Sequence, residues 1–415
     1  MTQPTYRVVV YFDFPFAGTF FTLDDPVRGL LDDPTYTLYS ATPVDVTADV
    51  TSVNLRRGND SQLFPDTTTG TCTINLNNDD ACTLGPRTYD PQNSASPYFG
   101  NILPNRRVVV YCNDQQVFTG RVADWDFVYN VNGRSEAVMK CVDGLGILAR
   151  QELDTFTATS AQAPGARISA VLDRSEVQWP YERSIDTGNS VLTGDTVSFG
   201  TNALEYLNTV NKSELGLLFC AKDGTLTFRD RFSAQQSASS LTFADDGSGV
   251  PYSAVSTQYG SELLFNRVVV NNTGFSPSTS IDVVSQAEYG IATYSTPTLL
   301  LNSSTQMLDL ASYLLNSYAN PEYRVVSIQT PFMALSTADQ LSVLSLDLAS
   351  VVTVTFTPNG TGTPISLDAT VIGIMHEIGH ATHNVTLSLA DLNRSSQFTL
   401  DSVLYGVLDS SQLAF

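Results

Sequence analysis

The feature that most constrains this fold is a succession of short β-rich runs separated by Gly, Pro, Asn and Asp. Runs of Val, Ile, Thr, Tyr and Phe with such punctuation are typical of strands joined by tight turns. The clearest runs cover residues 6–14, 72–76, 107–112, 117–122, 137–142, 217–220, 225–228, 265–270 and 351–356. The hydrophobic fraction of 42% is enough to build cores under these strands. The pattern therefore predicts a mainly β chain.

Only two segments show helical periodicity. Residues 202–213 place Leu204, Leu207 and Val210 on one stripe, with Asn202 available as a cap. Residues 304–319 carry a similar stripe from Met307 to Tyr318 and stop before a proline. We expect both to be core-packing helices, which makes the fold class mainly β with a few short helices (α+β).

A chain of 415 residues is longer than one core usually organises, so several domains are expected. A Thr/Ala/Gln-rich stretch at 155–166 is interpreted as a linker, and polar transitions follow at 233–240 and 321–323. These seams divide the chain into blocks 1–150, 151–235, 236–322 and 323–415. The string RVVVY occurs at 7–11 and again at 107–111, which we interpret as independently buried strands rather than as a duplication.

The charge balance excludes several classes of partner. There are 42 acidic and 21 basic residues, giving a net charge of −21. Such a chain repels phosphate, which argues against stable nucleic-acid binding and against anionic membrane surfaces. No apolar run approaches the ~20 residues of a membrane span. The five scattered cysteines contain no CxxC pair and are expected to be reduced, as suits assembly in a bacterial cytoplasm.

All three histidines fall in one octapeptide, from His376 to His383. His376, Glu377 and His380 match the HExxH pattern of zinc proteases. On a helix the two imidazoles would share a face and bind zinc, with Glu377 as general base. A zinc metallopeptidase using these residues, or a metal site that includes His383, is therefore one hypothesis.

The surroundings of the motif favour a different interpretation. No glutamate follows Glu377, and residue 386 is threonine, so no recognised third ligand is present at a known spacing. The preceding residues are β-branched, and residues 384–390 alternate polar and apolar with period two. These flanks predict a metal-free β-hairpin in which Gly379 is a bulge or turn residue.

A series of elements in the first block resembles a known family. In order they are Arg56-Arg57-Gly58, the strand-like run 70–78, the turn-rich segment Asp90-Pro91 to Pro104, Arg106-Arg107-Val108, Val117-Phe118-Thr119-Gly120-Arg121-Val122, and Asp143-Gly144-Leu145. This order is similar to the N-terminal part of minor tail proteins of long-tailed phages, the baseplate or tail-tip hub family. The closing block resembles the strand pairs that end such proteins, with Val371, Ile374, His376 and Ile378 and then Val385 to Leu389 on the pattern.

The resemblance implies an architecture of two related β-barrel domains, 1–150 and 323–415, with two smaller α+β domains, 151–235 and 236–322, between them. It further implies a non-enzymatic structural virion protein without cofactor, assembled in the host cytoplasm and located at the tail tip. Such a hub is a homotrimer that caps the tail tube and forms the channel gated for DNA ejection. Its partners are the distal tail or tail tube protein, the tape measure protein and other tail-tip proteins, and DNA passes only transiently.

Four arginines are candidates for intersubunit contacts: Arg56, Arg57, Arg106 and Arg107. They are among the few bases of an acidic chain, so a neighbour's carboxylates would suit them, although a solvated turn explains Arg56 and Arg57 equally well. A host-glycan-binding tail-tip protein is a further alternative. Trp125 and Trp179 could stack on sugars, but core packing is the simpler explanation for both.

Overall fold

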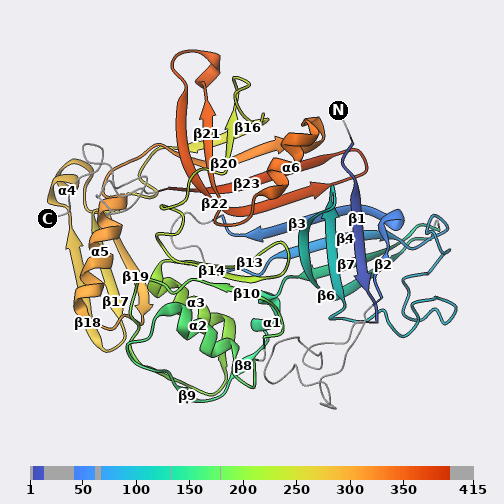
Figure 1. Cartoon of the computed structure of the whole chain (residues 1–415), viewed down its shortest axis with the longest axis horizontal. Coiled ribbons are helices and arrows are strands. Elements are labelled where there is room, and N and C mark those ends of the chain that lie inside the picture. The colour runs from blue at the N-terminus through green and yellow to red at the C-terminus, as the bar shows by residue number, and fades with distance from the viewer. Residues whose placement is uncertain (1–2, 14–41, 61–66, 132, 178, 393–415) are drawn as a thin grey trace.

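One curled sheet organises the chain (Figure 1). The computed structural model describes all residues except 1–2, 14–41, 61–66, 132, 178 and 393–415. Within these residues, 13 strands form a single sheet with the order β16-β20-β23-β22-β3-β4-β7-β6-β5-β1-β2, to which β21 joins at β22 and β15 at β21. The strands are β1 (Tyr6–Tyr11), β2 (Val44–Asp45), β3 (Val50–Gly58), β4 (Thr71–Asn77), β5 (Arg107–Cys112), β6 (Gln115–Tyr129), β7 (Ser135–Val142), β15 (Leu241–Ala244), β16 (Ala254–Gln258), β20 (Arg324–Pro331), β21 (Val351–Phe356), β22 (Ile365–Ile378) and β23 (His383–Asp391).

The first and last blocks of the chain meet where β3 pairs with β22. The two strands are antiparallel, in a register that runs from Gly58 opposite Gly373 to Val53 opposite Ile378. Figure 1 shows the blue β3 beside the red β22, although more than 300 residues separate them in sequence. One hydrophobic core contains residues from both blocks, so the sheet joins them into one body.

Alternation along the strands explains which face is buried. In β4, Cys72, Ile74 and Leu76 are buried, while Thr73 and Asn75 on the opposite face are only half-buried. Each predicted β run overlaps an observed strand, and the prediction of a mainly β chain is confirmed. Phe14, at the end of the first predicted run, lies outside the described residues.

The two RVVVY strings form neighbouring strands. β1 and β5 pair antiparallel along their whole lengths, with Val9 opposite Val109. Their valines are buried, which requires apolar residues on both faces of the two strands. The repeated string therefore reflects a common buried environment.

A second hydrophobic core is formed mainly by residues 145–228, from the middle of the sequence. Trp179, Leu207 and Phe228 are among its buried side chains. Its elements are α1 (Leu145–Leu148), β8 (Glu152–Leu153), β9 (Phe156–Thr157), α2 (Pro164–Leu172), β10 (Arg183–Ile185), β11 (Thr196–Val197), β12 (Thr201–Asn202), α3 (Ala203–Glu214), β13 (Leu217–Cys220) and β14 (Leu226–Arg229). The first predicted helix is confirmed as α3. The Asn202 side chain caps it, as predicted, by accepting a hydrogen bond from the Glu205 amide.

The interpretation of residues 155–166 as a linker is wrong. This stretch contains β9 and the start of α2, and Pro164 occupies the first turn of that helix, where its missing N–H costs nothing. Arg167 of α2 is buried and binds the Asp195 carboxylate at 2.8 Å. A charged residue on the inner face hides the apolar stripe that would identify the helix.

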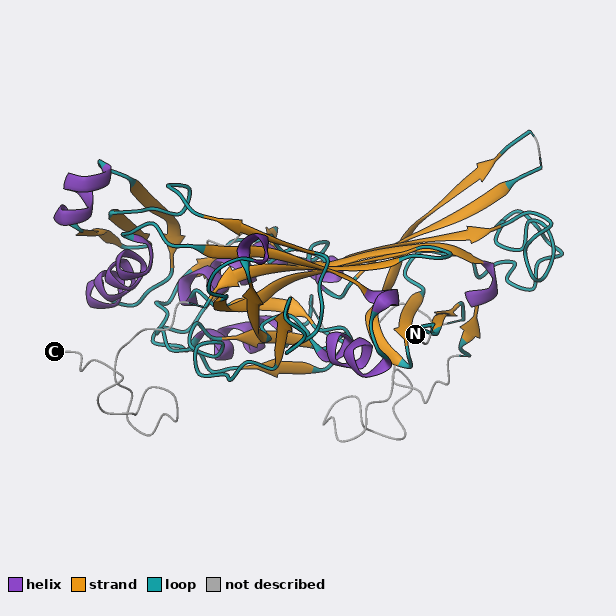
Figure 2. Cartoon of the chain, turned by 90° about the horizontal axis from the view of Figure 1, so that it is seen from above, coloured by secondary structure: helices purple, strands orange, loops and turns teal. Residues whose placement is uncertain are grey.

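A third, smaller unit occupies one end of the elongated molecule (Figure 2). It consists of β17 (Arg267–Asn272), β18 (Phe275–Ile281), α4 (Val283–Tyr289), β19 (Thr293–Leu299) and α5 (Ser304–Tyr318). α5 is the second predicted helix, capped by Ser303, and buries Met307, Leu310 and Leu314 against this sheet. The preceding strands β15 and β16 instead belong to the main sheet. The division into two barrel domains and two inserted domains stays a prediction.

We predict that Gly58→Ala destabilises the junction of β3 and β22. Gly58 has φ +78, and a Cβ there would lie 2.1 Å from the Ile372 carbonyl oxygen. The left-handed backbone costs roughly 1–2 kcal/mol for alanine, and the clash adds about 1–3 kcal/mol. The matched control is Gly100→Ala, because Gly100 has φ +79 with nothing within 4 Å of an added Cβ. Urea denaturation should show the larger loss at Gly58; equal losses would contradict the packing argument.

Candidate functional site

The octapeptide that contains all three histidines is a β-hairpin. β22 ends at Ile378, the chain turns, and β23 begins at His383. Gly379 lies in the turn, where its amide donates to the Thr382 carbonyl oxygen at 2.8 Å. The hairpin prediction is therefore confirmed. His376 lies in a strand and His380 in the turn, so the helix that a HExxH zinc site requires is not formed.

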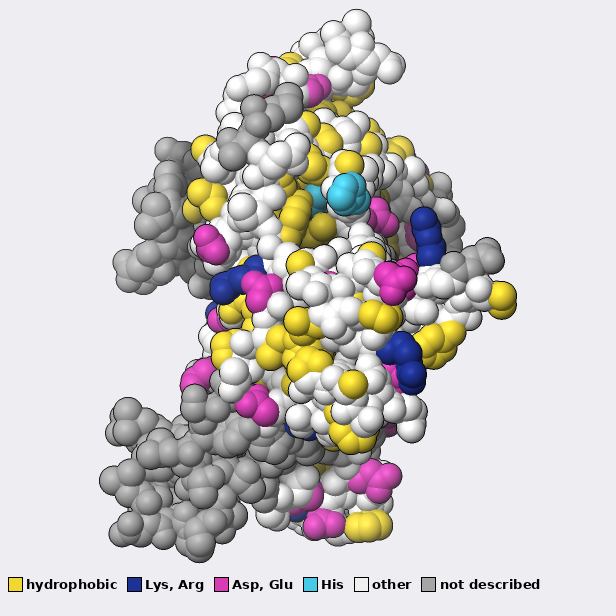
Figure 3. All heavy atoms as spheres, turned by 90° about the vertical axis from the view of Figure 1, so that its right-hand side faces the viewer, with side chains coloured by type: hydrophobic (Ala, Val, Ile, Leu, Met, Phe, Trp, Pro, Cys, Tyr) yellow, Lys and Arg dark blue, Asp and Glu magenta, His cyan; other side chains and the backbone are white. Residues whose placement is uncertain are grey.

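The two strand histidines are buried and hydrogen-bonded to each other, whereas His380 is exposed. Nδ1 of His376 lies 2.9 Å from Nε2 of His383, and Nδ1 of His383 lies 3.0 Å from the Tyr6 hydroxyl. Figure 3 looks onto this end of the molecule and shows histidine atoms (cyan) at the surface. Among the described residues, no three His, Cys, Asp or Glu side chains gather as a metal-binding group.

Burial controls the charge state of this pair. It lowers the pKa of His383 to about 3. It lowers the pKa of His376 well below its usual value, and the His383, Arg57 and Lys222 charges lower it further. Both imidazoles are therefore neutral at pH 7, which is the form that a buried site without a carboxylate partner favours.

The first predicted arginine pair is divided between the two faces of β3. Arg57 points inward and is buried, with its guanidinium 2.6 Å from the Asp347 carboxylate. The backbone amide of Lys222 donates to the same carboxylate at 3.0 Å. The Lys222 ammonium donates to the carbonyl oxygens of Leu344 and Ser345, at the end of α6 (Thr337–Ser345). This cluster therefore joins the first, middle and last blocks of the chain.

Asp143, from the Asp-Gly-Leu element, lies beside this cluster. Its carboxylate accepts from the Gly70 amide at 2.8 Å and from the Leu145 amide at 3.0 Å. Burial raises the pKa of Asp143 to about 7, while these amides and the Arg57 charge oppose that rise. The carboxylate therefore fixes the start of β4 against the end of β7.

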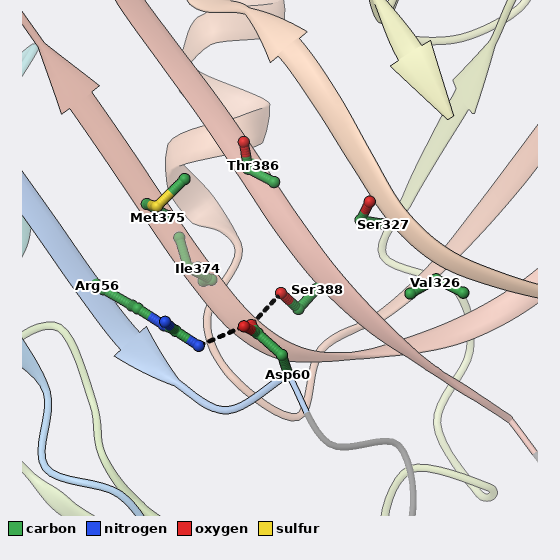
Figure 4. Close-up of a pocket in the computed structure, with 8 residues that line it drawn as sticks. All are labelled: Arg56, Asp60, Val326, Ser327, Ile374, Met375, Thr386 and Ser388. Atoms are coloured by element: carbon green, nitrogen blue, oxygen red, sulfur yellow. Dashed lines mark hydrogen bonds and ion pairs between the residues drawn. The ribbon is translucent and has the colours of Figure 1, made fainter. Parts of the chain in front are cut away.

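Arg56 points outward into a groove on the opposite face of the sheet (Figure 4). Its guanidinium pairs with Asp60, and Asp60 also accepts from the Ser388 hydroxyl at 2.7 Å. The groove has a volume of about 320 Å³. It is lined by Arg56, Asp60, Val326, Ser327, Ile374, Met375, Thr386 and Ser388. The groove therefore has one exposed ion pair above a floor of uncharged side chains.

Arg106 directly precedes β5, and Arg107 is its first residue. Arg106 donates to the Asn101 carbonyl oxygen at 3.2 Å, and the Arg107 guanidinium lies 5.3 Å from the centre of the Tyr11 ring. An intersubunit role for Arg56, Arg106 and Arg107 stays a prediction, whereas Arg57 has its carboxylate partner inside the chain. Sequence reasoning missed Tyr6, Asp347 and Lys222. The one available signal was that Lys222 is one of only three lysines in the chain.

The two tryptophans have different surroundings. Trp179 is only 2% exposed in the middle core, so it cannot stack on a sugar, and the core-packing interpretation is confirmed for it. Trp125 is partly buried, stacks on Phe127 with ring centroids 6.3 Å apart, and donates to the Leu103 carbonyl oxygen. The glycan hypothesis therefore loses one of its two residues.

The curled sheet and its attached units occur in solved phage tail proteins. No family model and no curated protein matches the sequence. The tail protein from Neisseria meningitidis MC58 is 11% identical, with a TM-score of 0.58 over 92% of this chain and 96% of the other. The 43 kDa tail protein of prophage MuSo2 from Shewanella oneidensis is 11% identical, with a TM-score of 0.55 over 94% and 99%. The prophage tail protein gp18 from Listeria monocytogenes EGD-e is 10% identical, with a TM-score of 0.50 over 93% and 94%.

These likenesses define the class of fold, a mainly β architecture built on one large curled sheet. The chain has the fold of phage tail proteins over nearly its whole described length, as the sequence resemblance predicted. Within that length, no helix combines the extent and the apolar character that a membrane crossing demands.

We predict that Arg57→Met destabilises the protein by about 3 kcal/mol or more, because it leaves the Asp347 carboxylate without its buried partner. The double variant Arg57→Met/Asp347→Asn should recover part of this loss. The control is Arg56→Met on the same strand, whose exposed ion pair is expected to contribute less than about 1 kcal/mol. Denaturation midpoints measure all three. Equal effects at the two arginines would contradict the assignment.

Proposed function

We propose that this chain is a structural virion protein, the tail-tip or baseplate hub of a long-tailed phage. The observation that carries the proposal is the shared fold: three phage tail proteins superpose on more than nine-tenths of this chain and of their own lengths. The ordered elements of the first block and the strand pair of the closing block support it independently. The HExxH residues lie on a hairpin and not on the helix that a zinc protease site needs, which favours the structural role over the metallopeptidase hypothesis.

The sheet suits a ring-building role. β1–β7 form one part of it and β15, β16 and β20–β23 form another, and the pairing of β3 with β22 joins them. In the proposed homotrimer, two such parts in each subunit provide six similar positions around the axis. That number matches the six-fold symmetry of a tail tube, which the hub would cap.

The charge of the chain suits a channel through which DNA passes without binding. A net charge of −21 repels phosphate, and carboxylates along the channel wall would keep DNA from adhering during ejection. On the face shown in Figure 3, acidic and basic side chains are scattered among uncharged ones and form no basic patch. The proposed partners are the distal tail or tail tube protein, the tape measure protein and other tail-tip proteins.

The groove around Arg56 is the proposed contact with a neighbouring subunit or tail protein. Arg56 and Asp60 are both about half exposed or more, so a second chain can reach each of them. Arg106 and Arg107 are further proposed contacts. Arg57 is assigned to the interior of the subunit because its guanidinium is buried and paired.

We predict that an antibody against this chain labels purified phage particles at the distal end of the tail, because the hub caps the tube there. Electron microscopy of gold-labelled particles measures the position. The control is the same antibody pre-absorbed with the purified protein. Label on the capsid or along the tail, or absence of the chain from particles, would contradict the proposal.

A further inference from the structure

The curled sheet has a seam that backbone pairing does not close. β1 and β23 are not paired with each other: in the order of the sheet they are separated by β22, β3, β4, β7, β6 and β5. The Tyr6 hydroxyl of β1 nevertheless reaches Nδ1 of His383 in β23 at 3.0 Å. A second link, from the Asn113 amide to the Gln340 side chain at 2.9 Å, lies between the turn after β5 and α6. Side chains therefore hold this seam.

An open pocket lies beside this hydrogen bond, between β1, β3 and the hairpin turn. Its volume is about 170 Å³, which exceeds that of a cavity able to hold a benzene molecule. Tyr6 and Val8 of β1 and Val110 of β5 line it, together with residues 50–53 at the start of β3 and with Ile378 and His380 at the hairpin.

With both imidazoles neutral, two arrangements of protons satisfy all three groups of the chain. In one, the Tyr6 hydroxyl donates to Nδ1 of His383, and Nε2–H of His383 donates to Nδ1 of His376; in the other, both hydrogen bonds run in the opposite direction. A proton added to either ring leaves both hydrogen bonds possible, because the Tyr6 hydroxyl can also accept. It gives the buried pair a positive charge, however, and that charge needs a counterion or water.

The surroundings offer a proton no compensating charge. Arg57 of β3 and the nearby Lys222 are the charged groups that act on His376, and both are positive. The carboxylate that joins this network, Asp347, is already paired with Arg57.

The remaining elements around the pair contribute uncharged groups. β1 presents Tyr6, and the neighbouring Cys112 lies in β5. The segment η2 (Phe332–Ala334) places the Phe332 ring 4.3 Å from the His383 ring. A protonated imidazole would therefore be a buried, uncompensated cation.

We propose that Tyr6, His383 and His376 form an acid-sensitive clasp, which holds the seam closed while both imidazoles are neutral and releases β1 from β23 when either is protonated. The clasp is a property of the subunit and does not depend on the proposed tail-tip role.

The test is a distance measured across the seam as a function of pH. Thr5 and Thr382 are exposed and flank Tyr6 and His383, so Thr5→Cys and Thr382→Cys place two spin labels on opposite sides. The five native cysteines are buried. Pulsed electron spin resonance should give one short distance at pH 7.5. Below pH 6.5 the ratio of open to closed seam should rise by about tenfold per pH unit for each proton bound on opening.

Matched glutamine variants assign the effect to the buried pair. His383→Gln retains an acceptor for Tyr6 and a donor for His376 but does not titrate, so loss of the short distance should move to lower pH. His380→Gln, three residues away in the exposed turn, should leave the pH profile unchanged. Tyr6→Phe removes the bridging hydroxyl and should weaken the short-distance population already at pH 7.5.

A profile that stays flat from pH 7.5 to 4 would overturn the clasp, as would an equal shift in His380→Gln and His383→Gln. If His383→Gln fails to fold, histidine-ring resonances of the wild-type chain decide the matter. Two of the three rings should remain neutral until the short distance is lost. Protonation of all three rings with the seam still closed would contradict the proposal.

Discussion

The pairing of β3 with β22 is the constraint on which the rest of the structure depends. It joins residues more than 300 positions apart into one sheet. The buried histidine pair, the Arg57–Asp347 cluster and the groove around Arg56 all lie on these two strands or beside them. Loop-closure entropy opposes such a distant contact, so it must be stabilised locally. The buried Arg57–Asp347 pair provides specificity there, because a shift of register by one residue would turn Arg57 outward and bury Arg56 without a partner.

Local patterns predicted the elements well because each depends on neighbouring residues. Alternation identified β4, and the cap at Asn202 identified the start of α3. The same logic favoured strands over a zinc-binding helix for the octapeptide, since the residues after His383 alternate with period two. The helix α2 was missed because Arg167 on its inner face breaks the apolar stripe.

The candidate site was harder to predict because its contacts are long-range. Nothing near Arg57 in the sequence indicates Asp347, and nothing near His383 indicates Tyr6. Such pairs arise from the curvature of the sheet and leave no periodic trace. The fold persists at 10–11% identity to known tail proteins, which accords with a fold set by the pattern of buried and exposed positions more than by particular residues. The octapeptide forms a hairpin instead of a zinc-binding helix, and in the clasp proposed above two of its histidines hold the seam.

The central claim is that this curled sheet is one subunit of a ring-shaped hub. The most direct test is the mass of the purified full-length chain in solution, measured by light scattering over a range of concentrations. The account predicts a trimer of three 44.9 kDa chains, about 135 kDa, that persists on dilution. A monomer of 44.9 kDa at every concentration, in the absence of other tail proteins, would contradict it.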